Sequence, residues 1–557
     1  MTITFRNPKM HTVPLLERAI ILQKEALEAI GIALAEKGSD DEGNGRIALH
    51  RIQVPAFNLA RLLSEAAGAE AMVRFSGKEE SGDFEQRLAL LSVAASVNNL
   101  ATVLTNDPLQ FGIHDQGPFE EFLSIANHLK LHSSSASWVH FGQEVLSRDS
   151  EFSGNAGLDE IHSEFRAMFA RFADSVIAPI AEQIHRRDQI IPDDVLSQLA
   201  ELGAFGISIP QEYGGSFFDH SAMVLATEEL SRASLGAGGS VLTRPEICAK
   251  ALLAGGTEEQ KNKWLPIIAS GKKMVCIAVT EPNTGSDVAR VSLTATRTAN
   301  GYLLNGEKTW ATFAGRSEIL CVLARTGAPD SGHKGLSLFL VEKPYDPASD
   351  EHHFRYQQTD GGLIEGHSIP TIGYRGMHSF SVTFENYFVP ADQLIGEEGR
   401  GFYLQMQGFA GGRIQTAARA VGVMEGAFRE AISYVKSRKA FGQPLSEFGL
   451  TQQKIGQMAV KIQTNRQLAL HVAGLMDSGE GSAEASLVKF LACKDAEWVT
   501  REAMQLHGGM GYSEEYPVSR HFVDARVLSI FEGAEEILAL QVIARPFLEQ
   551  LRQPVIA

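Results

Sequence analysis

The feature that most constrains the fold is a change of hydrophobic pattern in the middle of the chain. Between residues 274 and 396, short runs such as "EILCVLART" and "GLSLFLVEK" are separated by Gly, Asn, Asp and Pro, which is typical of antiparallel strands with tight turns. On both sides, apolar residues recur at three- and four-residue steps, the period of a helix. Helices, a compact β unit and helices again predict an α+β fold with segregated layers, not alternating βαβ units.

The helical flanks divide further. The segment "LLERAIILQKEALEAIGIALAEKG" ends at Gly38, a typical helix stop, and "DFEQRLALLSVAASVNNLATVL" repeats its period. The Ser- and Gly-rich stretch "LHSSSASWVHFGQEVLSRDSEFSGNAG" indicates a boundary near residue 150. We therefore predict four parts, which are an N-terminal helical extension (1–150), a helical domain (151–273), a middle β domain (274–396) and a C-terminal helical bundle (397–557).

Charge and composition exclude several classes of function. The 557 residues carry a formal net charge of −17, so a basic nucleic-acid surface is not expected, and an anionic ligand needs local Arg, Lys or backbone N–H groups. No GxGxxG leads from a strand into a helix and no Walker motif occurs, which argues against Rossmann and P-loop sites. Apolar residues make up 44% of the chain, enough for large buried cores.

The cysteines and the N-terminus indicate the compartment. Cys248, Cys276, Cys321 and Cys493 lie far apart with no CxxC pair, which argues against a zinc site or a disulfide framework and suits a reducing cytoplasm. The start "MTITFRNPKMHTVPLL" lacks the layout of a signal peptide, and no run approaches the roughly 18–20 apolar residues of a membrane span. A cytoplasmic protein without a membrane span is expected.

Two stretches of the β region carry candidate chemistry. "AVTEPNTGSD" (278–287) is an apolar strand that ends in a turn bearing the hydroxyls of Thr280, Thr284 and Ser286, which suits a polar ring edge or a phosphate, or is simply a capped loop. In "GEKTWATFAG", Trp310 and Thr312 alternate on one strand face, where the indole either joins the core or covers a flat cofactor.

Three further stretches lie in the C-terminal helical region. In "KSRKAFGQPL", Arg438 either pairs with a phosphate or caps a solvated helix end. The glycines of "LHGGMGYSEEYP" allow a ligand to approach the backbone closely. In "IFEGAEEI", Glu535 and Glu536 fall in the first turn of a helix, where carboxylates favour the positive dipole end, whereas Glu532 precedes the turn.

In this order and spacing, the five stretches resemble the acyl-CoA dehydrogenase family from about residue 155 to the end. The resemblance implies a helical domain, a middle β-barrel-like domain and a C-terminal four-helix bundle. It also implies FAD as cofactor, an acyl-CoA thioester as substrate and electron-transfer flavoprotein as electron acceptor. The first 150 residues lie outside it. Their expected role is structural, with a packing or lid function as the alternative, and by filling a surface that relatives use for tetramer assembly they would favour a dimer.

The resemblance places cofactor residues one by one. In the family, the FAD of one subunit is also contacted by a neighbouring subunit, which implies a homo-oligomer. The matching positions in this chain are Arg438, Phe441, Gln505, Gly508 and Gly509. This chain departs from the family pattern at two positions. Phe313 stands where the family often has Asn or Ser, and Gly449 stands where it often has Gln. The full set of implied FAD contacts is Thr280, Ser286, Trp310, Thr312, Arg438, Phe441, Gln505, Gly508, Gly509, Ala534 and Glu536.

The reaction implied by the resemblance removes an α-proton from the thioester while hydride leaves the β-carbon. Glu532 matches the common catalytic base, and the helix that carries the base in other branches reads "FAGGRIQT", with Gly412 before Arg413 and no carboxylate. The backbone N–H of Glu532 and a ribityl hydroxyl of FAD are implied to hold the enolate oxygen. Ser286, Arg413 and Gly533 are implied to lie along the CoA thioester.

The resemblance implies that the segment "GAGGSVLTRPEICAK" lines the distal end of the acyl pocket. Gly238 and Gly239 suggest spare room, and Thr243 and Arg244 are polar for a fatty tail. Arg244 either pairs with a substrate carboxylate or with Glu246 at a helix start. We expect a short, branched dicarboxylic acyl-CoA. The alternatives are another short-chain acyl-CoA such as isobutyryl-, butyryl- or glutaryl-CoA, an acyl-CoA oxidase, and a catalytically silent flavoprotein partner, against which the retained Glu532 speaks.

Overall fold

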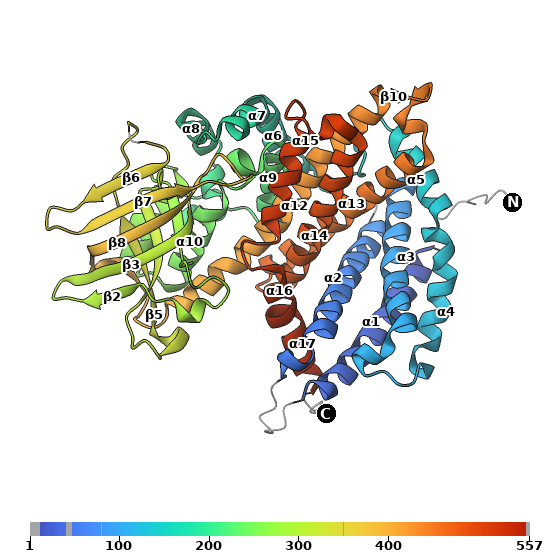
Figure 1. Ribbon diagram of the computed structural model, residues 1–557, viewed down its shortest axis with the longest axis horizontal. Helices are drawn as coiled ribbons and strands as arrows, with labels where there is room; N and C mark the ends of the chain where they lie inside the picture. Colours follow the sequence, from blue (N-terminus) through green and yellow to red (C-terminus); the bar gives the residue numbers. More distant parts are fainter. Residues whose placement is uncertain (1–11, 40–46, 79–80, 349, 553–557) are drawn as a thin grey trace. The chain divides into compact units, whose positions relative to one another are not determined.

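The computed structural model describes residues 12–39, 47–78, 81–348 and 350–552 (Figure 1). These residues form two compact units. The terminal unit comprises the described residues up to Ser163 and from Val423 onward, and the central unit comprises Glu164–Gly422. The division falls within one long helix, α12 (Gly401–Ser437).

The terminal unit is almost entirely helical. A short hairpin, β10 (Lys439–Ala440) and β11 (Gln443–Pro444), follows α12. The main helices are α1 (Thr12–Lys37), α2 (Gln53–Ser76), α3 (Asp83–Asn106), α4 (Glu120–Leu129), α5 (Ser135–Ser147), α13 (Gly449–Asp477), α14 (Glu484–His507), α15 (Val518–Leu528), α16 (Glu535–Ile537) and α17 (Arg545–Arg552). The helices expected at 15–38 and 83–104 are confirmed as α1 and α3, and α1 ends before Gly38.

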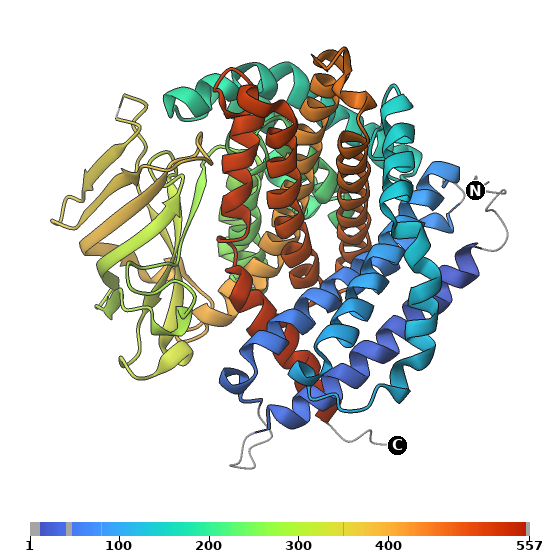
Figure 2. The ribbon, with the colours of Figure 1, turned by 45° about the vertical axis from the view of Figure 1, so that its right-hand side comes forward.

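The N-terminal extension packs on the C-terminal helices of the same unit. In Figure 2 the blue and cyan helices lie along the orange and red ones, and α2, α3 and α5 all contact α13. The backbones of α5 and α13 approach so closely that a Cβ on Gly142 would lie 1.7 Å from the carbonyl oxygen of Gln452. Helix α5 occupies part of the stretch interpreted as a boundary, because the polar segment still carries an apolar stripe of Trp138, Phe141 and Val145, all buried.

Helix α3 differs from the expectation that no run has the length and composition of a membrane span. Its mean hydropathy over an 18-residue window is 1.6, and it is the one helix of the described ranges that meets both criteria. Within that window 56% of the residues are buried, and the helix packs against α1, α2 and α13. Its apolar surface thus contributes to the core of the terminal unit.

The central unit combines helices with a large sheet. Its helices are α6, which begins at Glu160 (Glu160–Phe172), α7 (Ala178–Arg187), α8 (Asp193–Glu201), α9 (His220–Ala233), the π-helical turn η9 (Leu235–Gly239), α10 (Thr243–Gly255) and α11 (Glu258–Ala269). Its strands are β1 (Val275–Ala278), β2 (Thr294–Arg297), β3 (Gly301–Thr312), β4 (Ile319–Arg325), β5 (Leu336–Glu342), β6 (His353–Gln357), β7 (Leu363–Ile369), β8 (Ser379–Pro390) and β9 (Leu394–Ile395).

The sheet has the order β6-β7-β8-β3-β2-β4-β5-β9, and β1 pairs with β4. Most neighbours are antiparallel, as the short runs predicted. The exceptions are the β1–β4 pair and the single β2–β4 bridge, which are parallel. The long segment 279–293 connects β1 to β2. Strands β4 and β5 coincide with the two quoted runs, and β1 to β9 lie between residues 274 and 396, where strands are predicted.

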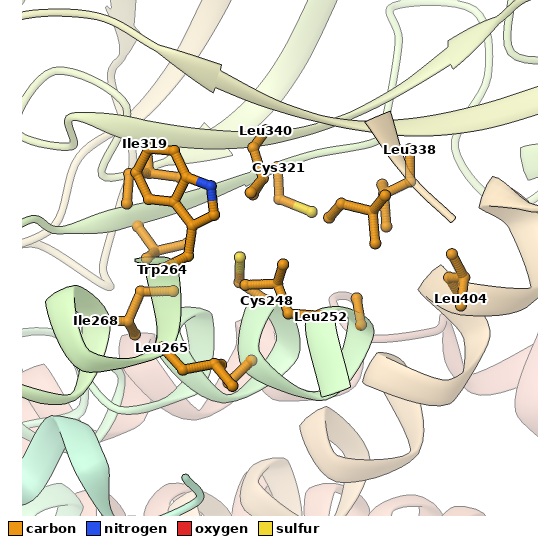
Figure 3. Packing of buried hydrophobic residues seen from close by; sticks show 14 of the residues in the cluster. Cys248, Leu252, Trp264, Leu265, Ile268, Ile319, Cys321, Leu338, Leu340 and Leu404 are labelled. Atoms are coloured by element: carbon orange, nitrogen blue, oxygen red, sulfur yellow. The ribbon is translucent and has the colours of Figure 1, made fainter. Parts of the chain in front are cut away.

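Strand β4 shows how the sheet is buried on both faces. Ile319 and Cys321 pack against Trp264 and Cys248 of α11 and α10 (Figure 3). The alternate residues Leu320 and Val322 point to the opposite face, where side chains from β1 to β8 form a second core. The middle domain is therefore a folded-over sheet with its own interior and a helical cover, which confirms the expected combination of helical, β and helical layers.

Candidate active site

The turn after β1 is the first candidate element. The backbone groups of Glu281 and Thr284 exchange N–H···O bonds of 3.0 Å in both directions, which closes the Pro-Asn turn. Thr309 donates its backbone N–H to the carbonyl oxygen of Thr280 at 2.8 Å and so ties this turn to β3. Thr280 is half-buried and Ser286 is exposed, so the hydroxyl of Ser286 and the edge of the turn remain open to a ligand.

A buried ion pair lies beneath this turn. Nζ of Lys308 donates to Oε1 of Glu281 at 2.8 Å and to the carbonyl oxygen of Val279 at 2.9 Å. The Glu281 carboxylate also accepts from the backbone N–H groups of Ser292 and Leu293, each at 2.8 Å. The sequence analysis missed this pair, for which the available signal was a lysine on the otherwise apolar face of a strand.

Burial opposes the charge on both partners. It lowers the pKa of Lys308 to about 8, although Glu281 acts in the opposite direction. Burial would raise the pKa of Glu281, but the attraction of Lys308 and the hydrogen bonds outweigh it, and the pKa is lowered. Both groups are therefore charged at pH 7, and the carboxylate fixes both ends of the 281–293 loop.

A β-bulge in β3 sets the orientation of Trp310 and Thr312, the candidates for covering a flat cofactor ring. The pairing of β3 with β8 shifts between Lys308 and Ala311, and Trp310 adopts a left-handed backbone with φ of +58°. Its indole is 54% exposed, whereas Ala311 beside it is fully buried. Thr312 returns to the open face, where its Oγ1 lies 2.9 Å from Oγ of Ser379. A tryptophan held out of the core in a strained conformation indicates a functional position.

Phe313, the residue that departs from the family pattern, is buried and also has a positive φ, of +69°. Its backbone N–H donates to the carbonyl oxygens of Met377 (2.9 Å) and His378 (2.8 Å). This position therefore contributes to the fixation of the strand end, and its side chain offers no polar contact.

Arg244 lies at the start of α10 and is 5% exposed. One guanidinium nitrogen donates to the carbonyl oxygen of Ser240 at 2.7 Å, the other to the Tyr374 hydroxyl at 2.7 Å, and Sδ of Met377 lies 4.0 Å away. No carboxylate of the described residues lies within salt-bridge distance of it. The alternative partner, Glu246, instead contacts Lys250 (3.1 Å) and the side chain of Gln415.

Thr243 and the glycines before it also lie in this segment. The Thr243 hydroxyl is fully buried and has no hydrogen-bond partner within the described part of the chain. The expectation that Gly238 and Gly239 leave spare room is wrong. A Cβ at Gly238 would meet the carbonyl oxygen of Leu230 at 2.4 Å, and one at Gly239 would meet Oγ of Ser231 at 1.7 Å. These glycines allow η9 to pack tightly on α9.

Two more arginines of the central unit come from α12. Arg413 is half-buried. Arg419, which the sequence analysis did not single out, is fully buried and donates to Oγ of Ser240 at 3.3 Å and to the hydroxyl of Thr416 at 2.6 Å. Since Arg244 bonds the carbonyl of the same Ser240, two buried guanidinium groups share one neighbour.

In the terminal unit, Arg438 and Phe441 lie at the hairpin after α12. Phe441 and Gly442 form its two-residue turn with φ of +51° and +84°, as in a type I′ turn. Phe441 is 98% exposed, and Arg438 is exposed and forms no ion pair with any described residue. An exposed aromatic ring in a position that favours Asn or Gly indicates a contact surface.

The end of α14 presents an open backbone. Gln505 is exposed, and Gly508 has φ of +59° and ψ of −138°, a conformation that L side chains rarely adopt. A Cβ on Gly508 or Gly509 would meet nothing within 4 Å, so these glycines leave room for a ligand. The preceding His507 stacks on Tyr434 with ring centroids 4.3 Å apart, which holds the helix end in place.

Glu532 occupies a turn between α15 and α16. Its φ is +54°, and the next residue, Gly533, has φ of +101°. Nζ of Lys489 donates to the carbonyl oxygen of Gly533 at 2.7 Å and holds the turn. Oε2 of Glu532 is buried and has no hydrogen-bond partner in the described residues. A carboxylate oxygen without a donor is a free proton acceptor.

The other two carboxylates have ordinary surroundings. Helix α16 begins at Glu535, directly after Ala534, which confirms that Glu535 and Glu536 lie in a first helical turn. Glu535 pairs with Nζ of Lys494 at 2.5 Å, and Glu536 is exposed. Only Glu532 of the three therefore combines a buried oxygen with a free acceptor site.

Comparison with known families agrees with this architecture. The chain matches the acyl-CoA dehydrogenase N-terminal domain over residues 159–272, the middle domain over 276–387 and the C-terminal domain over 399–547. The protein belongs to the acyl-CoA dehydrogenase family. It is an FAD-dependent oxidoreductase that acts on a CH–CH bond of an acyl-CoA.

Individual relatives match this chain with different identities and over different lengths. The chain is 38% identical to (2S)-methylsuccinyl-CoA dehydrogenase of Cereibacter sphaeroides, over 96% of this chain and 99% of that protein. Butyryl-CoA dehydrogenase of Megasphaera elsdenii is 31% identical with a TM-score of 0.64, covering 70% of this chain and 99% of its own. A chain from a structure of the electron transferring flavoprotein of Acidaminococcus fermentans is 33% identical, with a TM-score of 0.65. The match covers 71% of this chain and 99% of that chain.

Proposed function

We propose that this protein oxidises (2S)-methylsuccinyl-CoA to mesaconyl-CoA in the ethylmalonyl-CoA pathway. The observation that carries the proposal is the buried guanidinium of Arg244, which has hydrogen bonds to a carbonyl and a phenol but no carboxylate of the described chain near it. A buried cation costs free energy unless an anion pairs with it. The similarity to the Cereibacter sphaeroides enzyme, which includes the N-terminal extension, supports the same substrate.

Glu532 is the base in this proposal. It takes the proton from the α-carbon, while hydride leaves the β-carbon and the C=C bond forms between the two. Its unsatisfied Oε2 suits proton abstraction, because no donor competes for the lone pair. The strained turn at Glu532 and Gly533 holds the carboxylate in one orientation, and the neighbouring backbone N–H groups suit the oxygen that becomes negative in the transition state.

The residues around the two candidate cofactor regions fit FAD. Bound FAD supplies the acceptor for the hydride. The exposed indole of Trp310 covers a flat ring, Thr280 and Thr312 offer hydroxyls to its polar edge, and Ser286 also serves the CoA side. The open backbone at Gly508 and Gly509, with Gln505, Arg438, Phe441, Ala534 and Glu536, suits the dinucleotide.

The distal carboxylate of the substrate binds Arg244. Tyr374 orients the guanidinium through its hydroxyl, and the orphaned Thr243 hydroxyl gives the carboxylate a second donor. Arg413 is assigned to the CoA portion of the substrate and Gly533 to the thioester. A charge-assisted pair of this kind in a buried pocket selects strongly against a neutral acyl group.

The protein acts as a cytoplasmic homo-oligomer that passes electrons to electron-transfer flavoprotein. Phe441 at the hairpin tip is 98% exposed apart from an edge-on contact with Phe448, and Arg438 beside it forms no ion pair with any described residue. Both features support a contact with a second copy of the chain. The N-terminal extension, which packs on α13, favours a dimer over a tetramer. The runner-up substrates are isobutyryl-, butyryl- and glutaryl-CoA.

Anaerobic bleaching of the flavin with a panel of acyl-CoA thioesters tests the substrate. The panel comprises methylsuccinyl-, isobutyryl-, butyryl-, glutaryl- and isovaleryl-CoA. Rapid bleaching by methylsuccinyl-CoA alone is expected. Bleaching by a neutral thioester at the same rate would discard the carboxylate pocket, and no bleaching by any of them would indicate a silent flavoprotein.

A further inference from the structure

Two strands of the central unit carry a cluster of ligand-type side chains outside the candidate active site. His353 of β6 lies directly opposite His367 of β7 in the antiparallel register. Glu365 lies two residues before His367, so its side chain points to the same face of the sheet. The imidazoles stack with centroids 4.5 Å apart and 25° between their planes.

The three side chains converge on one point. Nε2 of His353 is 3.0 Å and Nε2 of His367 is 3.9 Å from the same oxygen, Oε1 of Glu365. One ligand atom from each residue lies within 4.8 Å of the others. In a tetrahedral site with metal–ligand distances of about 2.1 Å, ligand atoms are about 3.4 Å apart. The two observed N···O spacings bracket that value, and the ligand atoms of the two imidazoles lie within 4.8 Å of each other.

We propose that His353, Glu365 and His367 form a binding site for a divalent transition-metal ion of the Zn²⁺ class. Two imidazole nitrogens and a carboxylate oxygen are the ligand set that Zn²⁺ takes in three-residue sites with an open fourth position. The exposure of His367 (68% of its side chain) provides the entry path and the open position for water.

Arg355 competes for the same carboxylate. Its Nη1 lies 3.4 Å from Oε2 of Glu365, on the oxygen that the imidazoles leave free. The positive charge does not block Oε1, but it withdraws electron density and repels a cation. Removal of this guanidinium therefore strengthens metal binding, whereas removal of a ligand weakens it.

A second group, Asp188, His352 and His378, also brings three ligand types together. Nε2 of His378 lies 2.9 Å from the carbonyl oxygen of Asp188, and the Asp188 carboxylate lies 3.4 Å from Nε of Arg375. Both groups thus have an arginine 3.4 Å from their carboxylate, and the second group serves as a comparison in the test.

A metal ion bound to these three residues connects β6 to β7 and stabilises their pairing. An ion that binds the folded sheet and not the unfolded chain stabilises the fold by RT ln(1 + [M]/Kd). Binding falls in acid, because imidazole ligands must be deprotonated. The four buried cysteines do not compete for the ion in the native protein.

The test is calorimetric titration of the untagged FAD-loaded protein with ZnCl₂, together with visible spectra after addition of Co²⁺. One equivalent is expected to bind, with tetrahedral Co²⁺ bands. His367→Gln or Glu365→Gln is expected to weaken binding at least ~10-fold, and Arg355→Gln is expected to tighten it. His114→Gln, at an exposed histidine outside the cluster, is the matched control and is expected to bind as the wild type does.

Three results overturn the proposal. One is the absence of binding tighter than on the order of 100 µM. Another is equal affinity in the His367→Gln and His114→Gln proteins. The third is binding that survives His367→Gln but is lost in Asp188→Asn, which would assign the ion to the second group. The heat of binding and the Co²⁺ spectrum do not depend on acyl-CoA turnover, so they separate this proposal from the proposed function.

Discussion

Nζ of Lys308 lies 2.8 Å from Oε1 of Glu281, and both groups are buried beneath the turn that carries Thr280 and Ser286. The ion pair connects β3 to the start and the end of the 281–293 loop. The two residues thus hold the turn at Thr280 and Ser286 in place without offering a side chain to a ligand themselves.

Lys308→Met is expected to lower both FAD content and stability. It leaves a buried carboxylate without its cation, a change that typically costs about 3–5 kcal/mol. The ratio of flavin to protein absorbance and the thermal midpoint measure the effect. Lys334→Met, at an exposed lysine of the same unit, is the control. If the Lys308→Met protein matched this control in both measurements, the ion pair would have no role in forming the cofactor turn.

Glu532→Gln is expected to retain FAD and to lose turnover by a factor of about 10²–10⁴, the usual contribution of a general base. The amide has nearly the same shape but does not accept the α-proton. Rapid-mixing measurements of flavin reduction report this step directly. The matched control is Glu515→Gln, an exposed carboxylate before α15, with an expected rate near that of the wild type. A near-normal rate in Glu532→Gln would assign the proton transfer to another residue.

Glu425 of α12 links the segment after α5 to α13 within the terminal unit. Its carboxylate accepts from Ser153 (2.8 Å), Arg429 (2.8 Å) and Arg466 (3.2 Å). Burial would raise the pKa of Glu425, but the two arginines outweigh it and hold the pKa far below its usual value of 4.5. The folded state therefore binds this proton less readily than the unfolded chain, and the stability present above pH 4.5 is lost as pH falls.

Glu425→Gln is accordingly expected to lower the thermal midpoint strongly at pH 7, with a cost of about 3–5 kcal/mol for the broken buried pair. The difference from wild type shrinks as pH falls below about 4.5, because the unfolded wild-type chain then takes up this proton while the folded carboxylate stays ionised. Scanning calorimetry from pH 7 down to about pH 3 measures the trend, with the exposed Glu480→Gln as control. A difference that stays constant with pH would contradict the assignment.

The thiols are expected to be inert in the native protein. All four cysteines are free and buried. A hydrogen bond with Cys248 and burial raise the pKa of Cys321 well above its usual value, and burial raises the pKa of Cys276 to about 12. The sulfur atoms of Cys248 and Cys321 meet inside the helix–sheet core (Figure 3). Reaction with a disulfide reagent at pH 8 should give no fast thiol before unfolding and four after it; a fast native thiol would contradict this.

Much of the fold could be predicted because local patterns and tertiary packing agree. The strands at 319–325 and 336–342 are short, mostly apolar runs bounded by turn residues, and the helices at 12–37 and 83–106 keep apolar residues at three- and four-residue steps. Helix α5 could not be separated from a linker, because its serines dominate the composition while three apolar residues make its packing face. The parallel β1–β4 pair depends on a crossover that no local pattern encodes.

The site was partly predictable for a similar reason. Motif residues such as Trp310 and Glu532 lie in continuous stretches, whereas Tyr374 reaches Arg244 from 130 positions away and Arg419 reaches Ser240 from 179. Backbone strain also leaves no sequence signature, because Trp310, Phe441 and Glu532 all adopt positive φ without being glycine. Gly238 and Gly239 misled the analysis, since a glycine marks close packing as readily as open space.

The central claim is that buried Arg244 reads a carboxylate on the acyl group. The most direct test compares kcat/KM for methylsuccinyl-CoA and for 2-methylbutyryl-CoA, its neutral counterpart, in the wild-type and Arg244→Met proteins. Wild type is expected to prefer the carboxylate by about 100-fold or more, roughly 2.7 kcal/mol. Arg244→Met is expected to lose most of that preference and keep its FAD. Equal rates for the two thioesters in the wild type, or an unchanged preference in the variant, would contradict the account.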